Sequence, residues 1–201
     1  MTRAEPLCLD FANTRFWRGT PSPTETLGRP EDLLDWMEQA SLPGVIPLRA
    51  TWPAAPDAAT TALGAARGMR EALYRLLAGT AEAGDLAALN AALAALPPRR
   101  RLEAETDGFS WLVEPDAGAT GLPGPLAPVL WSAADLLTSP RRSRVHCCAN
   151  PQCRWLFLDE SRNGSRRWCS MAGCGNRAKA HRHYERRRGS TGSDPANTSF
   201  S

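Results

Sequence analysis

The chain has 201 residues, 42% of them hydrophobic and 22% charged, and its formal net charge at pH 7 is +3. This length suits one ordinary domain with a small appended unit. No apolar run is long enough for a signal peptide or a membrane-spanning helix, so we expect a cytoplasmic protein with no membrane attachment.

The small net charge hides two oppositely charged parts. Residues 1–140 hold 11 arginines against 17 acidic residues, a net charge of −6, whereas residues 141–188 hold 13 basic residues against three acidic ones, a net charge of +10. A basic segment joined to an acidic body is typical of proteins that bind polyanions. We therefore expect a first domain over residues 1–140, a basic module over residues 141–188 and a disordered tail over residues 189–201.

Helical periodicity dominates the first hundred residues. The spacing of apolar residues predicts helices over residues 8–17, from Pro30, over residues 57–78 and from Asp85, which can act as an N-cap. Four prolines between residues 41 and 56 predict an irregular connection there.

Residues 99–114 change character. Apolar and polar positions alternate there around Thr106-Asp107-Gly108, which predicts a β-hairpin. A loop rich in glycine and proline over residues 115–125 leads to a helix over residues 126–138 with a wide apolar stripe. The expected fold class is α+β, with a mainly helical N-terminal domain that carries a small hairpin.

Five of the six cysteines lie within residues 147–174. Four of them form two pairs with equal spacing: Cys148 and Cys153, Cys169 and Cys174. In a reducing compartment such pairs indicate metal ligands, and two thiolate pairs match the tetrahedral set of a structural Zn²⁺. Cys147 or His146 could replace Cys148 as the first ligand because the three residues adjoin, but the matching spacing favours Cys148.

The residues around these pairs predict a small zinc module. The run Trp-Leu-Phe-Leu over residues 155–158 predicts a strand that leaves the first pair. The second pair precedes a helix that Asn176 can cap and that runs through Arg188. This order resembles a treble-clef finger, where the second pair lies at a helix start. The two aromatic residues of the strand and Trp168 are expected to form its core, although Trp168 could instead stack on a base.

The expected metal has a structural role. With four thiolates around it, the ion has no position for an activated water, and metal binding should supply folding free energy to a module with little apolar surface. The sequence contains no His-Glu-x-x-His, Gly-x-Ser-x-Gly or phosphate-loop pattern. We therefore expect no enzymatic activity.

The basic residues of the module predict binding to nucleic acid. Seven are candidate contacts: Arg162, Arg166, Arg167, Arg177, Lys179, Arg182 and Arg186. Guanidinium groups bind phosphates bidentately and guanine edges in the major groove, so double-stranded DNA is the expected partner. Two alternatives stay open, namely RNA and an adaptor function in which the basic module binds an acidic protein.

Two sequence motifs resemble known families. The stretches Cys148-Ala-Asn-Pro-Gln-Cys153, Arg166-Arg-Trp-Cys169 and Cys174-Gly-Asn-Arg177 resemble the CGNR zinc finger over about residues 144–187. The N-terminal stretch Leu9-Asp-Phe-Ala-Asn-Thr14 is similar to the opening of the ABATE domain, which commonly precedes this finger. The resemblance implies a stress-induced transcription regulator, and Cys147 is a local departure from the pattern.

The N-terminal domain is the candidate for regulation. We hypothesise that it senses a small-molecule effector or forms a homodimer, because a large helical unit precedes a module that binds nucleic acid. Asp10, Asn13, Thr14 and Arg15 lie beside an apolar segment. They could face a ligand, but we favour a role in capping and turning the chain.

Overall fold

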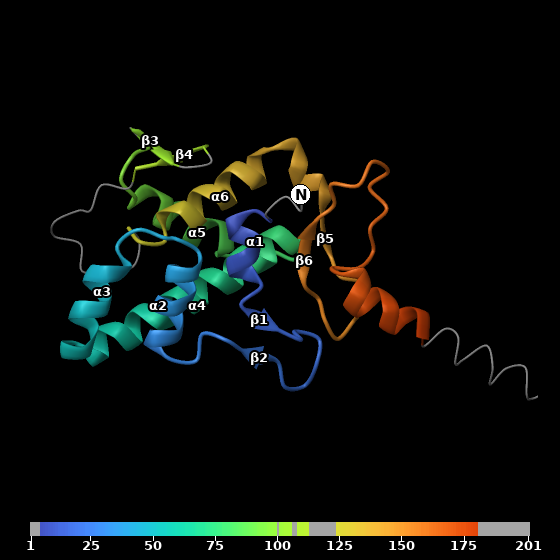
Figure 1. Cartoon of the computed structure of the whole chain (residues 1–201), viewed down its shortest axis with the longest axis horizontal. Helices are drawn as coiled ribbons and strands as arrows, with labels where there is room; N and C mark the ends of the chain where they lie inside the picture. Colours follow the sequence, from blue (N-terminus) through green and yellow to red (C-terminus); the bar gives the residue numbers. More distant parts are fainter. Residues whose placement is uncertain (1–4, 100, 106–107, 113–123, 181–201) are drawn as a thin grey trace, which may run out of the picture.

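The computed structural model describes residues 5–99, 101–105, 108–112 and 124–180. The N-terminal part is mainly helical (Figure 1). Its helices are α1 (Leu7–Ala12), α2 (Pro30–Gln39), α3 (Val45–Thr51), α4 (Pro56–Ala78), α5 (Asp85–Ala94) and α6 (Ala127–Thr138), with 3-10 turns η1 (Trp52–Ala54) and η2 (Pro140–Arg144). None of the helices in the described ranges is both long and apolar enough to cross a membrane.

Three antiparallel hairpins complete the described structure. They are β1 (Arg15–Phe16) with β2 (Thr24–Glu25), β3 (Leu102–Glu105) with β4 (Gly108–Trp111), and β5 (Val145–Cys147) with β6 (Leu156–Leu158). The expected hairpin is confirmed, with Leu102 opposite Trp111, and the expected fold class is confirmed with it. Residues 115–123 of the predicted loop lie outside the described residues. The predicted tail over residues 189–201 also lies outside them.

Helix α4 is the centre of the main core. It starts at Pro56, whose missing N–H costs nothing in a first turn, and ends at Gly79 with φ 77°, a conformation that favours glycine. Leu73 and Leu77 of α4 are fully buried, and α1 packs between α4 and α6 with Leu9 and Phe11 fully buried. The helices predicted from Pro30 and over residues 57–78 and 126–138 are confirmed.

The proline-rich segment is more ordered than the sequence indicated. Residues 41–56 were expected to be irregular, but they contain α3 and η1. Pro47 lies in the first turn of α3 and Pro53 lies in η1, where a backbone N–H is not required. Buried Val45, Leu48 and Trp52 fix the segment to the core, so packing overrides the proline signal.

Two helix boundaries also differ from expectation. Helix α1 ends at Ala12, not at residue 17, because Arg15 begins β1. Asp85 does not cap α5: it is the first helical residue, after an N-cap at Gly84. Its carboxylate accepts a hydrogen bond from the Glu82 N–H at 2.8 Å and pairs with Arg75 at 2.6 Å, so it fixes the turn before the helix.

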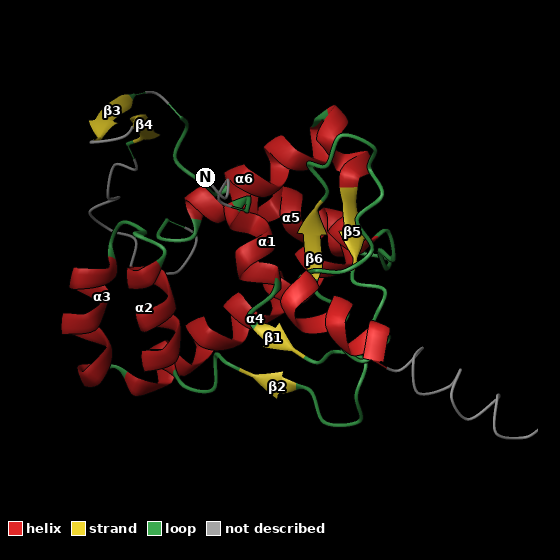
Figure 2. Cartoon of the chain, turned by 45° about the vertical axis from the view of Figure 1, so that its right-hand side comes forward, coloured by secondary structure: helices red, strands yellow, loops and turns green. Residues whose placement is uncertain are grey.

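The β5–β6 hairpin joins the C-terminal segment to the N-terminal core. It lies beside α1 and α4 in both views (Figures 1 and 2). Val145, Leu156 and Leu158 belong to the same buried cluster as the α1 and α4 residues. The change of charge near residue 140 therefore does not mark the end of the hydrophobic core.

Candidate metal centre and nucleic-acid interface

Four cysteine sulfur atoms lie together at one side of β6. The Sγ atoms of Cys148, Cys153, Cys169 and Cys174 all lie within 4.8 Å of one another. Cys169 Sγ lies 3.8 Å from both Cys153 Sγ and Cys174 Sγ. A Zn–S bond is about 2.3 Å, so sulfurs at tetrahedral corners are separated by about 3.8 Å. The arrangement therefore fits one tetrahedral ion.

The first cysteine pair lies on a turn that follows β5. The Cys153 N–H donates to the Asn150 carbonyl at 3.0 Å, and the Gln152 N–H donates to Asn150 Oδ1 at 3.1 Å. The Asn150 amide also lies 3.6 Å from Cys174 Sγ. Asn150 thus shapes the turn and contacts the sulfur cluster, as expected from an Asn-Pro turn.

The second pair lies at the start of a helix. Ser170 is the N-cap and accepts a hydrogen bond from the Gly173 N–H at 3.3 Å, and the π-helical turn η3 (Met171–Gly175) follows. Residues 176–180 continue the helix. The prediction that Asn176 caps this helix is wrong, because Asn176 already has helical φ and ψ of −66° and −39°.

The neighbours of Cys148 lie elsewhere. Cys147 Sγ lies 3.7 Å from Tyr74 Oη of α4, and the His146 ring centroid lies 6.0 Å from that of Phe157. Strand alternation explains the position of Cys147, because successive residues point to opposite sides of a strand. Within the described residues, Cys148 is therefore the member of the three that joins the sulfur cluster.

The electrostatics of the cluster suit a divalent cation. Burial and the neighbouring thiols raise the pKa of Cys153 to about 12, and the same causes raise the pKa of Cys169. For Cys148, burial opposes ionisation, but hydrogen bonds to its sulfur lower the pKa. Four crowded sulfurs cannot all ionise without a compensating charge, which a bound metal ion supplies.

A second small core surrounds the sulfur atoms. Phe157 is fully buried in it, and Trp155 and Trp168 pack against it as expected. Strand β6 thus serves two cores, because Leu156 and Leu158 face the main core while Phe157 faces the cysteines. Trp168 is half-buried in this position, which favours the packing role over stacking on a base.

The N-terminal part contributes to the same small core through Trp17. The loop after β1 places Trp17 against the cysteine cluster, and the Gly19 N–H donates to the Gln152 carbonyl at 3.1 Å. A Cβ atom at Gly19 would lie 1.7 Å from the Pro151 oxygen, so only glycine fits there. Sequence reasoning missed Trp17, because no local spacing links it to the cysteines.

Five of the candidate nucleic-acid contacts are exposed around the cluster. They are Arg162, Arg166, Arg167, Arg177 and Lys179. The Arg177 guanidinium carbon lies 5.2 Å from the Trp17 ring centroid, and that of Arg167 lies 5.7 Å from the Trp168 centroid. These contacts hold two arginines at the surface of the small core. Arg182 and Arg186 lie outside the described residues.

Arg166 differs from the other candidates. Its guanidinium donates to the carbonyls of Trp168 at 3.0 Å and of Cys169, and lies 4.4 Å from the Phe157 ring centroid. Its backbone N–H donates to the buried carboxylate of Asp159 at 2.8 Å. Arg166 therefore braces the finger, and its role as a nucleic-acid contact stays a prediction.

The polar residues of the N-terminal motif form internal contacts. Asn13 is buried, and its amide donates to the Leu156 carbonyl at 2.8 Å while its oxygen accepts from the Leu156 N–H at 2.9 Å. Thr14 Oγ1 donates to the Phe11 carbonyl at 2.8 Å. These contacts support the interpretation that the motif turns the chain, and they show that it also holds β6.

The charged residues of the motif are also paired. Asp10 accepts a hydrogen bond from Trp36 Nε1 at 3.2 Å, and Arg15 forms an ion pair with Glu71 at 3.6 Å. Both partners belong to the N-terminal part, so these side chains stabilise the packing of α1 and β1 against α2 and α4.

Comparisons with known families cover nearly the whole described chain. Residues 5–140 match the ABATE family, described as "putative stress-induced transcription regulator", and residues 139–187 match the CGNR zinc finger family. No curated protein matches the chain. The four-cysteine cluster of this finger identifies Zn²⁺ as its cofactor. The chain belongs to the ABATE family and carries a C-terminal CGNR zinc finger.

Proposed function

We propose that the protein is a zinc-dependent regulator of transcription that binds double-stranded DNA. The observation that carries the proposal is the group of exposed basic side chains, Arg162, Arg167, Arg177 and Lys179, around the four-cysteine cluster. The net charge of +10 over residues 141–188 supports a polyanionic partner. The family description, a regulator of transcription, favours DNA.

In this proposal, Cys148, Cys153, Cys169 and Cys174 hold one Zn²⁺ that cross-links the two halves of the finger. The bound ion supplies structural stabilisation and no open coordination position. The turn after β5 and the helix start after Ser170 orient the four sulfurs toward a common centre. Arg177 and Lys179 lie three and five residues after Cys174 in the helix that starts at the second cysteine pair, so the position of the sulfur cluster sets their position.

The two parts of the chain have different roles in this proposal. Residues 141–188 bind DNA, with the helix of Arg177 and Lys179 at the duplex and Arg162 and Arg167 on the phosphate backbone. Residues 1–140 regulate this binding, through a small-molecule effector or a homodimer. The shared core around β6 supports communication between the two parts.

Fluorescence anisotropy with a labelled duplex tests the proposal. We expect the affinity to fall steeply with salt, and Arg167→Ala, Arg177→Ala and Lys179→Ala should each lower the slope of log affinity against log salt by about one. Arg49→Ala is the matched control, because Arg49 is exposed in α3 and pairs with Asp35 and Glu38.

The alternatives give different outcomes in the same experiments. Equal binding of single-stranded RNA and duplex DNA would point to RNA as the partner. Capture of an acidic protein that resists nuclease, without salt-dependent binding to DNA, would support the adaptor function and contradict the proposal.

A further inference from the structure

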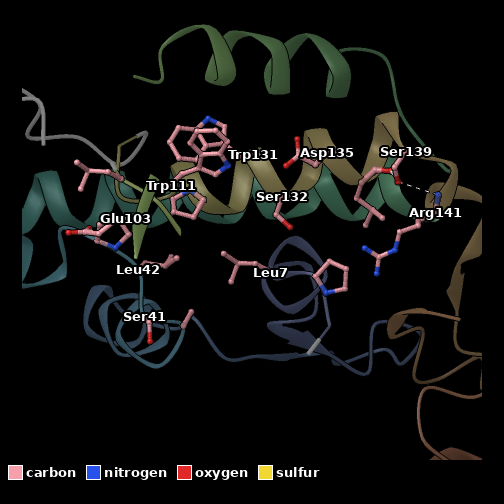
Figure 3. Close-up of a pocket in the computed structure, with 16 residues that line it drawn as sticks. Leu7, Ser41, Leu42, Glu103, Trp111, Trp131, Ser132, Asp135, Ser139 and Arg141 are labelled. Atoms are coloured by element: carbon pink, nitrogen blue, oxygen red, sulfur yellow. Dashed lines mark hydrogen bonds between the residues drawn. The ribbon is translucent and has the colours of Figure 1, made fainter. Parts of the chain in front are cut away.

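A cavity of about 880 Å³ lies between α1, the turn from α2 to α3, the β3–β4 hairpin and α6 (Figure 3). Its lining combines polar and charged side chains with apolar ones, among them Leu7, Leu42, Leu112, Trp111 and Trp131. Sites for small organic molecules have volumes of about 300–1,000 Å³, with apolar walls and a few polar groups that orient the ligand. None of the four clustered cysteines lines the cavity, so it is separate from the metal centre.

A positively charged group of the protein itself contacts three of the residues that line this cavity. Arg99, between α5 and β3, donates from Nη1 to the two carboxylate oxygens of Asp135 at 3.0 and 2.9 Å. Its guanidinium carbon lies 5.1 Å from the Trp131 ring centroid and 5.8 Å from that of Trp111. Trp111, Trp131 and Asp135 all line the cavity. Two indole rings and a carboxylate are the groups that bind organic cations.

The remaining charges of the lining also favour a cation. Glu103 adds a second carboxylate. Arg141 is the one basic residue among the described lining residues, and it forms an ion pair with Glu160 at 2.8 Å. An anionic ligand would therefore face two carboxylates and an arginine that is already paired.

Another cation can replace Arg99 as the partner of the Asp135 carboxylate. The Asp135 side chain is 65% exposed, and exposed ion pairs are weakly held. Arg99 lies in a short segment between α5 and β3, whereas Trp131 and Asp135 are fixed one helical turn apart on α6. The indole and carboxylate groups are thus rigidly placed while their present partner comes from a connecting segment.

We propose that this cavity binds an organic cation, an amine or guanidinium attached to an apolar body. The charged end takes the place of Arg99 between Trp111 and Trp131 and pairs with Asp135, and the body lies along Leu7, Leu42 and Leu112. Arg99 acts as an internal competitor for the site. The site is independent of DNA binding by the finger, so either proposal can fail without the other.

Isothermal titration calorimetry on the full-length zinc-loaded protein tests the site with three probes of similar shape: 4-phenylbutylguanidinium, 4-phenylbutanol and 5-phenylpentanoate. We expect the cation to bind at least about tenfold more tightly than the alcohol and the carboxylate. Arg99→Ala and Arg99→Gln should both strengthen binding of the cation by about threefold or more, because they remove the competitor. Asp135→Asn should weaken it by about tenfold.

Two control variants separate a specific change in affinity at the cavity from the general effect of removing a surface charge. Arg49→Ala and Asp57→Asn remove exposed charges from α3 and α4 and should leave the affinity unchanged. Zinc content and circular dichroism establish that each variant is folded, and Arg99→Gln decides the outcome if Arg99→Ala unfolds. The proposal is overturned by equal binding of the three probes, by tighter binding of the carboxylate, by weaker binding of the cation to the Arg99 variants, or by no binding of the cation.

Discussion

At the residue scale, Asn13 joins the N-terminal part to the zinc finger through both ends of its side-chain amide. It is only 3% exposed, and its amide and carbonyl pair with the backbone C=O and N–H of Leu156. Buried backbone groups need such partners, because water cannot replace them there. The sequence favoured a turning role for Asn13, but its partner in a distant strand could not be read from local spacing.

Asn13→Ala should lower the free energy of unfolding by about 2–4 kcal/mol, because it leaves two buried backbone groups of Leu156 without partners. Urea unfolding followed by circular dichroism measures the change. Asn90→Ala is the control, because Asn90 is exposed on α5, and its effect should stay within about 0.5 kcal/mol. Equal effects of the two substitutions would contradict the assigned role.

Arg70 and two glutamates make stability depend on acid pH. Arg70 is 2% exposed and donates to both oxygens of Glu25 at 2.5 Å and to Glu71 at 3.0 Å. Burial opposes ionisation of both carboxyls, but the hydrogen bonds and charges of the arginines together outweigh it. Arg70 lowers the pKa of Glu25 below the ordinary 4.5, and Arg18 together with Arg70 does the same for Glu71. The stabilisation is therefore present above about pH 4.5 and is lost as the pH falls through the lowered folded-state pKa values.

We expect the free energy of unfolding to fall as the pH is lowered below about 4.5, and Glu25→Gln to reduce this dependence. Urea titrations at a series of pH values give the measurement. Glu31→Gln, which changes an exposed residue of α2, should leave the pH dependence unaltered. A slope that Glu25→Gln does not change would show that other groups cause the acid sensitivity.

At the element scale, β6 is the strand that the two cores share. Leu156 and Leu158 pack with α1 and α4, and Phe157 packs with the cysteines. The apolar run over residues 155–158 predicted the strand, and the matching cysteine spacing predicted the cluster beside it. All three β6 residues are buried, as an unbroken apolar run favours, but the sequence does not show that the helical domain covers one face of this strand.

Leu156→Ala should destabilise the whole protein by about 2–5 kcal/mol, because it removes a fully buried side chain from the main core. Chemical unfolding should show one transition for tryptophan fluorescence and helical circular dichroism. Leu86→Ala, at a residue 57% exposed on α5, is the matched control and should have little effect. Loss of zinc from Leu156→Ala with unchanged unfolding of the helices would contradict a shared core.

At the scale of the whole molecule, the finger and the N-terminal part form one connected structure. Trp17 packs on the cysteine cluster, and Tyr74 of α4 donates a hydrogen bond to the Arg154 carbonyl at 2.7 Å. Local patterns predicted most of the helices, the β3–β4 hairpin and the cysteine cluster, since each depends on residues close in sequence. They could not predict these contacts between parts, which depend on shape complementarity between distant segments.

Metal removal should therefore affect more than the finger. We expect a chelator to lower the thermal midpoint of helix unfolding measured by circular dichroism, because the cysteine cluster contacts the N-terminal part through Trp17. Added Zn²⁺ should restore the midpoint. An unchanged midpoint in metal-free protein would mean that the N-terminal part folds independently of the cluster.

Cys148, Cys153, Cys169 and Cys174 are the four ligands of one zinc ion in the structure proposed above. Elemental analysis of the purified protein, combined with native mass spectrometry, measures the number of bound ions per chain. We expect one Zn²⁺ per chain in the wild type and in Cys147→Ser, whose thiol contacts Tyr74, and loss of the ion in Cys174→Ser. A metal-free wild type, or loss of zinc from Cys147→Ser with retention in Cys174→Ser, would contradict this assignment.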